Sequence, residues 1–447
     1  MQTFSTLARQ FEERTISAAS LLRSAREQAE RSVDLNALAF ADWEGAQVTA
    51  QQCDAARAAG QALGPLHGLP LSIKDLYPVR GMPMHAGTRA ALPAGTLDQA
   101  LLVSRLRKAG AVIFGKTNMH EIALGSTGEN SWTGDVKNPF DPLRQAGGSS
   151  SGAGVAVATG VGVASIGSDT GGSVRIPANF CGVTGFKPSH GAIPLDGALH
   201  LSWTCDHAGP LAASVADCAL LFEVMAARSL AVTRTARAPR LGVPTAWLNG
   251  RLAPAVRAHF ERTLERLTRA GAQLVDVATP LLPQAARCFT TIVQAEAAWT
   301  HRAALLQGGA GFSPSVLAPL QSGRQIAATD YIDALRMRAA IAAELDAVLA
   351  GCDALLLPTS AVVAPLRGQL HVEVESGPMT VREAVLGQTL PFSLVGVPAL
   401  SIPTGLVDAL PVSLQAVGAR GADAALLGLG QWLETQVGQR LQPPARP

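Results

Sequence analysis

The stretch GGSSSGAGVAVATGVGVASIGSDTGGSVRIPA, residues 147–178, is the most unusual part of the chain. Two turns rich in glycine and serine, at 147–152 and 167–173, enclose a run of small apolar residues. Glycine lets the backbone bring amide N–H groups close to a ligand, which both anion binding and oxyanion stabilisation require. A flexible linker would be polar throughout, but residues 155–166 are too apolar to be left in water.

Several known loop types compete as explanations of this stretch. A Walker loop ends in Gly-Lys-Ser/Thr, and a dinucleotide loop has GxGxxG directly after a strand, but neither pattern is present in register. The GxSxG elbow of α/β-hydrolases is also missing, and no acid followed by a histidine completes that triad. The pattern therefore favours a serine hydrolase whose base is a lysine.

The stretch resembles the signature of the amidase signature family, with no departure that we identify. The two key serines, Ser149 and Ser173, are 24 residues apart, as the family pattern requires. The likeness continues in segments 64–75, 115–119, 181–188, 353–359 and 391–415. This resemblance implies an α/β fold with a large mixed, mostly parallel β-sheet that helices cover on both faces.

The resemblance also implies a catalytic triad. It places the nucleophile of the family on Ser173, the bridging serine, which follows a cis peptide bond, on Ser149, and the base on Lys74. Lysine has a pKa of about 10.4 in water, so a lysine base must be buried to be neutral near pH 7. In a purely structural alternative, Lys74 ends a strand and pairs with Asp75, and Ser149 only completes a turn.

Further residues receive roles from the same resemblance, and none of the nine histidines receives one. The backbone N–H groups predicted to form the oxyanion hole are those of Thr170, Gly171, Gly172 and Ser173. The residues predicted to support the site are Ser150, Asp169 and Arg175, although Asp169 and Arg175 could instead form an ordinary surface salt bridge. The residues predicted to line the acyl pocket are Ala123, Leu124, Gly125 and Ser126.

The order of predicted elements is typical of an α/β protein. Apolar residues at helical spacing predict helices within residues 1–63 and at 99–109. Short apolar runs predict buried strands at 69–75, 111–115, 161–166, 354–357 and 399–402. We expect one domain over 1–447, with a helical N-terminal segment (1–63), a catalytic core (64–230), a helical cap over the substrate (about 245–350) and a C-terminal part of the core (351–447).

Composition excludes several classes of protein. The 36 basic and 34 acidic residues give a net charge of +2 without a basic stripe, which speaks against nucleic acid as a partner. Six scattered cysteines without a CxxC pair predict neither disulfides nor a zinc site, and we expect no metal and no cofactor. The N-terminus lacks the apolar core of a secretory signal, and the longest uncharged stretches are interrupted by glycine or proline. We expect a cytoplasmic monomer or homodimer that does not bind membranes.

The resemblance leaves the substrate open, because one fold serves many substrates. We expect hydrolysis of small-to-medium amides, including anilides, or of carbamates, through an acyl-enzyme on Ser173. The alternative is the glutamine-hydrolysing A subunit of a tRNA-dependent amidotransferase. Segment 202–210, SWTCDHAGP, departs from the Ser-Leu-Asp-Gln pattern usual in that subunit, which favours a stand-alone enzyme. A non-catalytic scaffold subunit would need to lack a triad residue, and all three residues are present.

Overall fold

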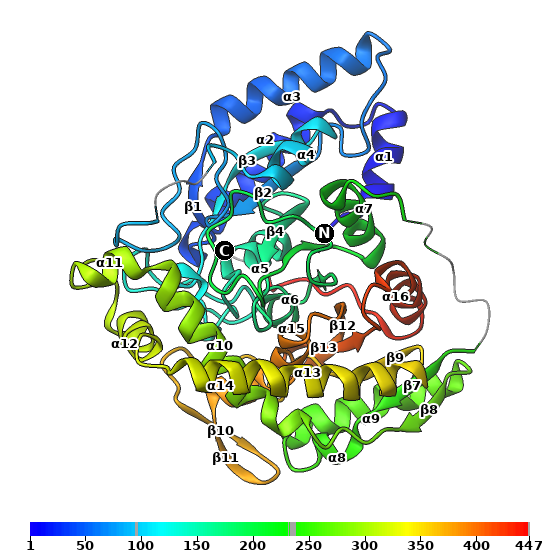
Figure 1. The fold of residues 1–447 in the computed structure, drawn as a ribbon. Helices are drawn as coiled ribbons and strands as arrows, with labels where there is room; N and C mark the ends of the chain where they lie inside the picture. The colour runs from blue at the N-terminus through cyan, green and yellow to red at the C-terminus, as the bar shows by residue number, and fades with distance from the viewer. Residues whose placement is uncertain (94–96, 231, 233–237, 446–447) are drawn as a thin grey trace.

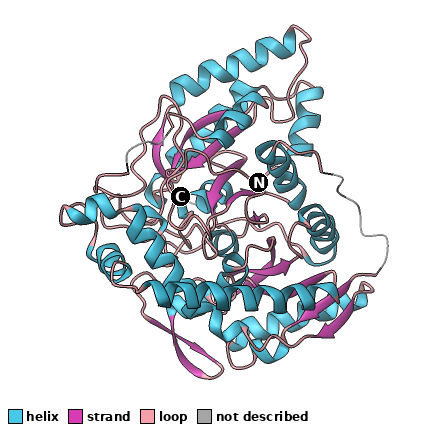
Figure 2. Cartoon of the chain, in the orientation of Figure 1, coloured by secondary structure: helices cyan, strands magenta, loops and turns pink. Residues whose placement is uncertain are grey.

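The computed structural model describes residues 1–93, 97–230, 232 and 238–445. In this part of the chain, eleven strands form one sheet, and helices surround it (Figures 1 and 2). The strands lie in the order β1 (Leu38–Ala41), β3 (Val112–Thr117), β2 (Pro70–Lys74), β4 (Ala164–Ser168), β6 (Ala208–Ala212), β5 (Thr184–Lys187), β12 (Ala399–Val407), β13 (Leu410–Val417), β9 (Ala354–Pro358), β7 (Arg240–Val243) and β8 (Gln273–Asp276). A separate hairpin consists of β10 (His371–Val374) and β11 (Gly377–Thr380).

The predicted mixed α/β sheet is confirmed. Its parallel pairs form two blocks, β3-β2-β4 and β9-β7-β8. Strands β6, β5, β12 and β13 join these blocks through antiparallel pairs, and β1 pairs antiparallel with β3. The expectation of mainly parallel pairing therefore holds within the two blocks but not between them, because the β12-β13 hairpin occupies the middle of the sheet.

Helices pack on both faces of the sheet. One group, which contacts β2, β4, β12 and β13, consists of α2 (Ala18–Arg31), α5 (Ser151–Thr159) and α6 (Arg175–Cys181). A second group consists of α7 (Val215–Ala226), α9 (Pro254–Arg269) and α16 (Asp423–Val437), which between them contact β5, β6, β9 and β12. Helix α4 (Leu101–Lys108) packs on α7.

The remaining helices lie mostly at the periphery, but all five residues of the short helix Leu390–Leu394 are buried. These remaining helices are α1 (Phe4–Glu12), α3 (Trp43–Ala58), α8 (Thr245–Leu248), α10 (Ala285–Thr300), α11 (Arg302–Leu306), α12 (Pro314–Gly323), α13 (Ala328–Ala350), α14 (Val381–Leu386) and α15 (Leu390–Leu394). Helix α10 packs against both α12 and α13, and the β10-β11 hairpin projects from the body beside α14 (Figure 1). Within the predicted cap range of 245–350, β8 is a strand of the large sheet and α9 packs on that sheet. The division of the chain into a core and a cap stays a prediction.

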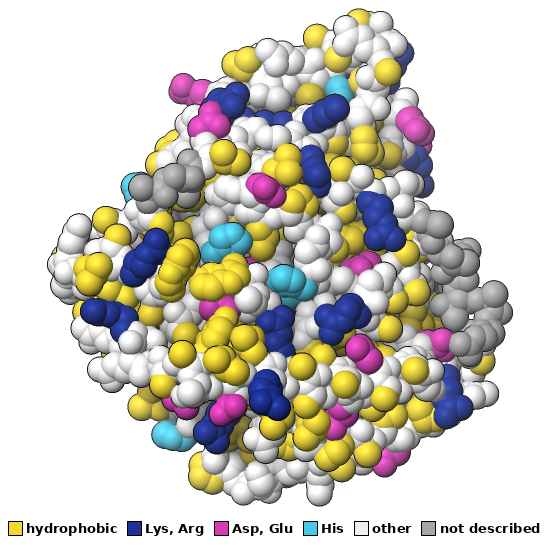
Figure 3. Space-filling model, in the orientation of Figure 1, with side chains coloured by type: hydrophobic (Ala, Val, Ile, Leu, Met, Phe, Trp, Pro, Cys, Tyr) yellow, Lys and Arg dark blue, Asp and Glu magenta, His cyan; other side chains and the backbone are white. Residues whose placement is uncertain are grey.

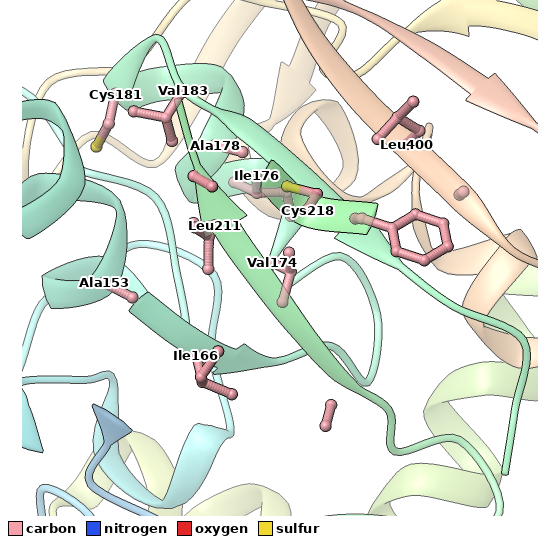
Figure 4. Close-up of a cluster of buried hydrophobic side chains, with 14 of the residues drawn as sticks. Ala153, Ile166, Val174, Ile176, Ala178, Cys181, Val183, Leu211, Cys218 and Leu400 are labelled. Atoms are coloured by element: carbon pink, nitrogen blue, oxygen red, sulfur yellow. The ribbon is translucent and has the colours of Figure 1, made fainter. Parts of the chain in front are cut away.

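The signature segment forms the centre of the core. Helix α5 is short and made of small residues, and all but its last residue are buried. It ends at Gly160, whose φ of +79° suits glycine. Figure 4 shows Ile166 of β4, Leu211 of β6 and Leu400 of β12 gathered with Val174 in one apolar cluster. This packing holds the turn before α5 and the turn before α6 against the same strands.

The strand predicted at 161–166 lies at 164–168 instead, because Gly160 and Gly162, both with positive φ, hold the chain in a turn until residue 163. The other predicted strands agree with β2, β3, β9 and β12 within a few residues, apart from the longer C-terminal end of β12.

Basic and acidic side chains are scattered among apolar ones on the face shown in Figure 3. Among the described helices, none is both long and apolar enough to cross a membrane.

Candidate active site

Lys74 is the last residue of β2, and its side chain is fully buried. Its Nζ atom lies 2.7 Å from Ser149 Oγ, 3.0 Å from Ser150 Oγ and 2.8 Å from Ser168 Oγ. Strands β2 and β4 are parallel neighbours, so the carboxyl ends that carry residues 74 and 168 lie at the same edge of the sheet. The fold thus surrounds one lysine with three hydroxyl groups.

The surroundings of Lys74 favour its neutral form. Burial lowers its pKa to about 7, although the negative charges of Asp169 and Asp206 oppose that shift. The Ser150 hydroxyl donates to the Ser168 carbonyl oxygen at 3.1 Å, so Ser150 Oγ accepts a hydrogen bond from Nζ. A neutral amine that also donates to Ser168 keeps a lone pair for the proton of Ser149. Lys74 is therefore placed to accept a proton from Ser149.

Ser149 and Ser173 belong to two backbone segments that are bonded together. The peptide bond between Gly148 and Ser149 is cis, as the resemblance implied. The next residue, Ser150, donates its backbone N–H to the Ser173 carbonyl oxygen at 3.2 Å. Ser173 is 5% exposed and lies in the wall of a large cavity, whereas Ser149 is fully buried behind it. Substrate can therefore reach Ser173 directly but not Ser149.

The turn from Thr170 to Ser173 carries four consecutive backbone N–H groups, and none of them donates to an acceptor in the described part of the chain. Thr170, Gly171 and Ser173 line the same cavity. Gly172 has a φ of +140°, and a Cβ there would stand 2.2 Å from Thr389 Oγ1, so only glycine fits. The turn thus presents free donors beside Ser173, as an oxyanion hole requires.

Asp169 and Arg175 hold this turn from behind, and both side chains are completely buried rather than on the surface. Arg175 donates from Nε to Asp169 Oδ2 at 3.0 Å and from Nη2 to Oδ1 at 2.9 Å. Burial raises the pKa of Asp169, but Arg175, together with Lys187 and His207, lowers it further, so the net pKa lies below the ordinary value and the carboxyl is ionised. Asp169 Oδ2 also accepts the N–H of Val174, which fixes the residue after Ser173.

Comparison with known proteins identifies the family. Residues 20–427 match the family model described as amidase. The chain belongs to the amidase family. It is a C–N hydrolase, because that is the chemistry of the amidase signature enzymes.

The relatives carry more than one name. The chain is 33% identical to the A subunit of the glutamyl-tRNA(Gln) amidotransferase of Ralstonia nicotianae, with 99% of both chains covered. It is 35% identical to the same subunit of Aromatoleum aromaticum, with 97% and 96% covered. Among solved structures, one described as "Crystal structure of amidase" is 49% identical, with a TM-score of 0.95 and 98% and 100% of the two chains covered.

A peptide amidase from Stenotrophomonas maltophilia is also similar in structure, at 26% identity, a TM-score of 0.82 and 99% and 98% coverage. The curated names thus agree with the alternative function that the sequence placed second, and the solved structures carry the names of amidases. The shared chemistry is hydrolysis of an amide C–N bond.

The amidase cavity has a volume of about 950 Å³. All four residues predicted to line it, Ala123, Leu124, Gly125 and Ser126, do so. The backbone at the start of this loop is unusual, since Ile122 has a φ of +43° and Ala123 one of +64°. Non-glycine residues in this region are uncommon and often mark functional sites.

Other parts of the cavity wall come from the range predicted as a cap and from the region of the β10-β11 hairpin, where the sequence singled out no individual residue. They include Phe289, Thr290 and Val293 of α10, Ser313 and Pro319 around α12, and Leu370, Val381 and Arg382 around the β10-β11 hairpin. Sequence patterns also missed Ser168, although it lies within the signature, and His120, which precedes the predicted pocket loop. The glycine and serine pattern gave no signal that could separate Ser168 from the other serines.

Proposed function

We propose that Ser173 is the nucleophile of an amide hydrolase in which Ser149 carries protons between Ser173 and Lys74. The observation that carries the proposal is the buried Lys74 amine, whose pKa is lowered to about 7 and whose Nζ lies 2.7 Å from Ser149 Oγ. A lysine of this kind is half neutral at pH 7 and can act as a general base. Ser173 alone of the three opens onto the cavity.

In the first half of the reaction, Ser173 Oγ attacks the carbonyl carbon while its proton passes to Ser149 and the proton of Ser149 passes to Lys74. The oxygen of the tetrahedral intermediate accepts hydrogen bonds from the free N–H groups of the turn at 170–173. The proton then returns along the same path to the departing nitrogen. The C–N bond breaks, and an acyl group stays on Ser173.

In the second half, water replaces the amine and attacks the ester carbonyl of the acyl-enzyme. Lys74 takes the proton of the water through Ser149, and the same donors stabilise the second oxyanion. Collapse of this intermediate releases a carboxylic acid and restores the Ser173 hydroxyl. The supporting residues Asp169 and Arg175 keep the turn in place, and the reaction needs no group beyond these side chains and the backbone.

Small-to-medium amides, anilides and carbamates are the proposed substrates of a stand-alone enzyme. A cavity of about 950 Å³ lies at the upper end of the range usual for small-molecule sites. Its wall includes the apolar side chains of Leu201, Phe289, Val293 and Leu386, which suit an aryl or alkyl group. A carbamate would use the same nucleophile and donors, and its carbonic or carbamic acid product would release carbon dioxide.

The second candidate is the A subunit of a glutamine-dependent amidotransferase, which the names of the curated relatives favour. In that case glutamine is the substrate, and further subunits complete the enzyme. Segment 202–210 differs from the pattern usual in that subunit, which favours the stand-alone enzyme. We propose that this enzyme is a monomer or homodimer in the cytoplasm. The chemistry at Ser173 is the same in both candidates.

A purified single chain can separate these candidates. We expect it to hydrolyse members of a panel of primary amides, anilides and aryl carbamates, and to form an acyl adduct on Ser173 that mass spectrometry locates. Ser173→Ala should lose at least about 1000-fold in kcat, because removal of a nucleophile abolishes the covalent route. Full activity of Ser173→Ala would refute the mechanism, and activity on glutamine only after addition of partner subunits would favour the amidotransferase.

A further inference from the structure

His120 lies in the cavity wall beside the proposed triad, although the mechanism gives it no role. Its backbone N–H donates to the Ser149 carbonyl oxygen at 3.1 Å. Burial and the nearby charge of Lys74 lower the pKa of the imidazole to about 4. The ring is therefore neutral at the pH at which Lys74 can act as a base.

Gly125 makes room for this ring. A Cβ built on Gly125 would stand 2.1 Å from His120 Nε2 and 2.4 Å from both Cδ2 and Cε1. Any larger residue at position 125 would push the ring away. The absence of a side chain at Gly125 thus leaves room for the face of the His120 ring, and both residues line the cavity.

The two ring nitrogens of His120 have different surroundings. Nδ1 lies 3.3 Å from Thr127 Oγ1. Nε2 has no hydrogen-bond partner among the described residues, and it is not one of their buried unpaired polar atoms. It is therefore accessible, and the opening beside it is the cavity that His120 lines.

The surroundings of Nδ1 favour one position for the proton of the neutral ring. Thr127 Oγ1 accepts the backbone N–H of Glu129 at 3.1 Å. This bond leaves the Thr127 hydroxyl proton free for Nδ1 of His120, and we assign the ring the tautomer in which Nδ1 accepts it. With Nδ1 accepting, the single proton of a neutral imidazole sits on Nε2. The ring thus presents an N–H donor to the substrate cavity.

We propose that His120 is a specificity-determining residue whose Nε2–H binds an uncharged oxygen that the substrate carries beside its scissile C–N bond. The substrate class is an amide or carbamate with a second oxygen acceptor near the reacting carbonyl, such as an alkoxyacyl amide, an ortho-alkoxyanilide or an acylurea. This inference rests on the proposed function of Ser173. A substrate without that oxygen covers the donor without pairing it, and this lowers the preference of the enzyme for that substrate.

Two matched pairs of anilides test the inference. Methoxyacetanilide and butyranilide differ by one oxygen on the acyl side, and the N-acetyl derivatives of 2-methoxyaniline and 2-ethylaniline differ in the same way on the leaving-group side. The measured quantity is the ratio of kcat/KM between the two members of a pair, in the wild type and in His120→Phe. Comparing ratios cancels the intrinsic reactivity of each compound and any general loss of folded protein.

We expect the ratio of at least one pair to fall about threefold to tenfold in His120→Phe, the effect of one neutral hydrogen bond. His120→Asn, which keeps an N–H donor, should recover part of that ratio. Gly125→Ala should lower it, because the added Cβ displaces the ring. Equal ratios in the wild type and His120→Phe for both pairs would overturn the inference.

Binding to Ser173→Ala, measured by calorimetry, separates this inference from the proposed function. If the wild type hydrolyses none of the four anilides but Ser173→Ala shows the oxygen preference in Kd, and Ser173→Ala/His120→Phe does not, the role of His120 stands and the proposed hydrolysis of anilides fails. If Ser173→Ala binds both members of each pair equally, or binds none of the four, the inference about His120 is wrong even where hydrolysis by Ser173 is confirmed.

Discussion

Replacement of Lys74 by methionine tests the central feature of the site, a lysine that is neutral near pH 7. The pKa of Lys74 is about 7 in the folded chain and about 10.5 in a solvated lysine. If the neutral amine is the base, kcat/KM of the wild type follows the neutral fraction of Lys74. We expect a plateau above pH 8, about half of the plateau at pH 7, and about 1% of it at pH 5.

The same pKa predicts an effect on stability. Between pH 7 and pH 10.5 the unfolded chain binds more protons at this lysine than the folded chain does, so the free energy of unfolding rises with pH. One pKa unit corresponds to about 1.4 kcal/mol, so the pH range from 7 to 9.5 corresponds to about 3 kcal/mol. Lys74→Met has no such group, and its advantage over the wild type should shrink by about that amount as the pH rises over this range.

The assays are pH profiles of kcat/KM with an anilide and urea unfolding at each pH, for the wild type and Lys74→Met. Lys187 provides a matched control, because burial also lowers its pKa to about 7, yet Nζ contacts the backbone carbonyls of Pro188 and Val397. Lys187→Met should keep the acid limb of the wild-type profile. A wild-type profile without an acid limb near pH 7, or a stability difference independent of pH, would refute the assignment of Lys74 as a neutral base.

Two further substitutions test the turn that carries Ser173. Asp169→Asn leaves the Arg175 guanidinium without its carboxylate in a fully buried site, so urea unfolding should show a loss of about 3 to 5 kcal/mol, and an unchanged midpoint would contradict the buried pair. Gly172→Ala should lower kcat about 100-fold or more, because a Cβ 2.2 Å from Thr389 Oγ1 forces the N–H donors to move. Gly191→Ala, at a φ of +78° with nothing within 4 Å of the added Cβ, should leave kcat unchanged, and equal losses in both variants would show that backbone strain alone matters.

The sequence predicted the three proposed catalytic residues because motif spacing and strand ends are local features. Lys74 was placed at the end of a strand, and β2 does end there. Ser168 was missed because β4 was predicted two residues too early at its C-terminal end, which put residue 168 in a turn. The contact between Lys74 Nζ and Ser168 Oγ, at 2.8 Å, becomes visible only in the structure.

The cavity wall was much less predictable. The pocket loop at 123–126 lies close to the motif in sequence, and its four residues line the cavity. The segments at 289–294 and 368–386 reach the cavity only through the packing of α10 and α14, elements that are far from the signature in sequence. No local periodicity marks such a contact, because it depends on how distant elements pack.

A comparison of Lys74 with Lys116 explains how the fold produces a neutral base from an ordinary residue. Both lysines are fully buried, and burial lowers both pKa values. Lys116 lies 2.7 Å from Asp75, whose charge offsets part of that shift, and the other oxygen of Asp75 accepts the N–H groups of His85 and Ala86.

Lys74 is the neighbour of Asp75 in sequence, but adjacent residues of an extended chain point to opposite sides. Its amine therefore meets hydroxyl groups, and no described carboxylate lies within ion-pair distance of it. The strand-end ion pair that the sequence allowed for Lys74 is thus made by Lys116. Because the Asp75 carboxylate is already occupied by these other donors, the cost of burying Lys74 is not offset by a directly paired opposite charge, and its neutral form becomes available for catalysis.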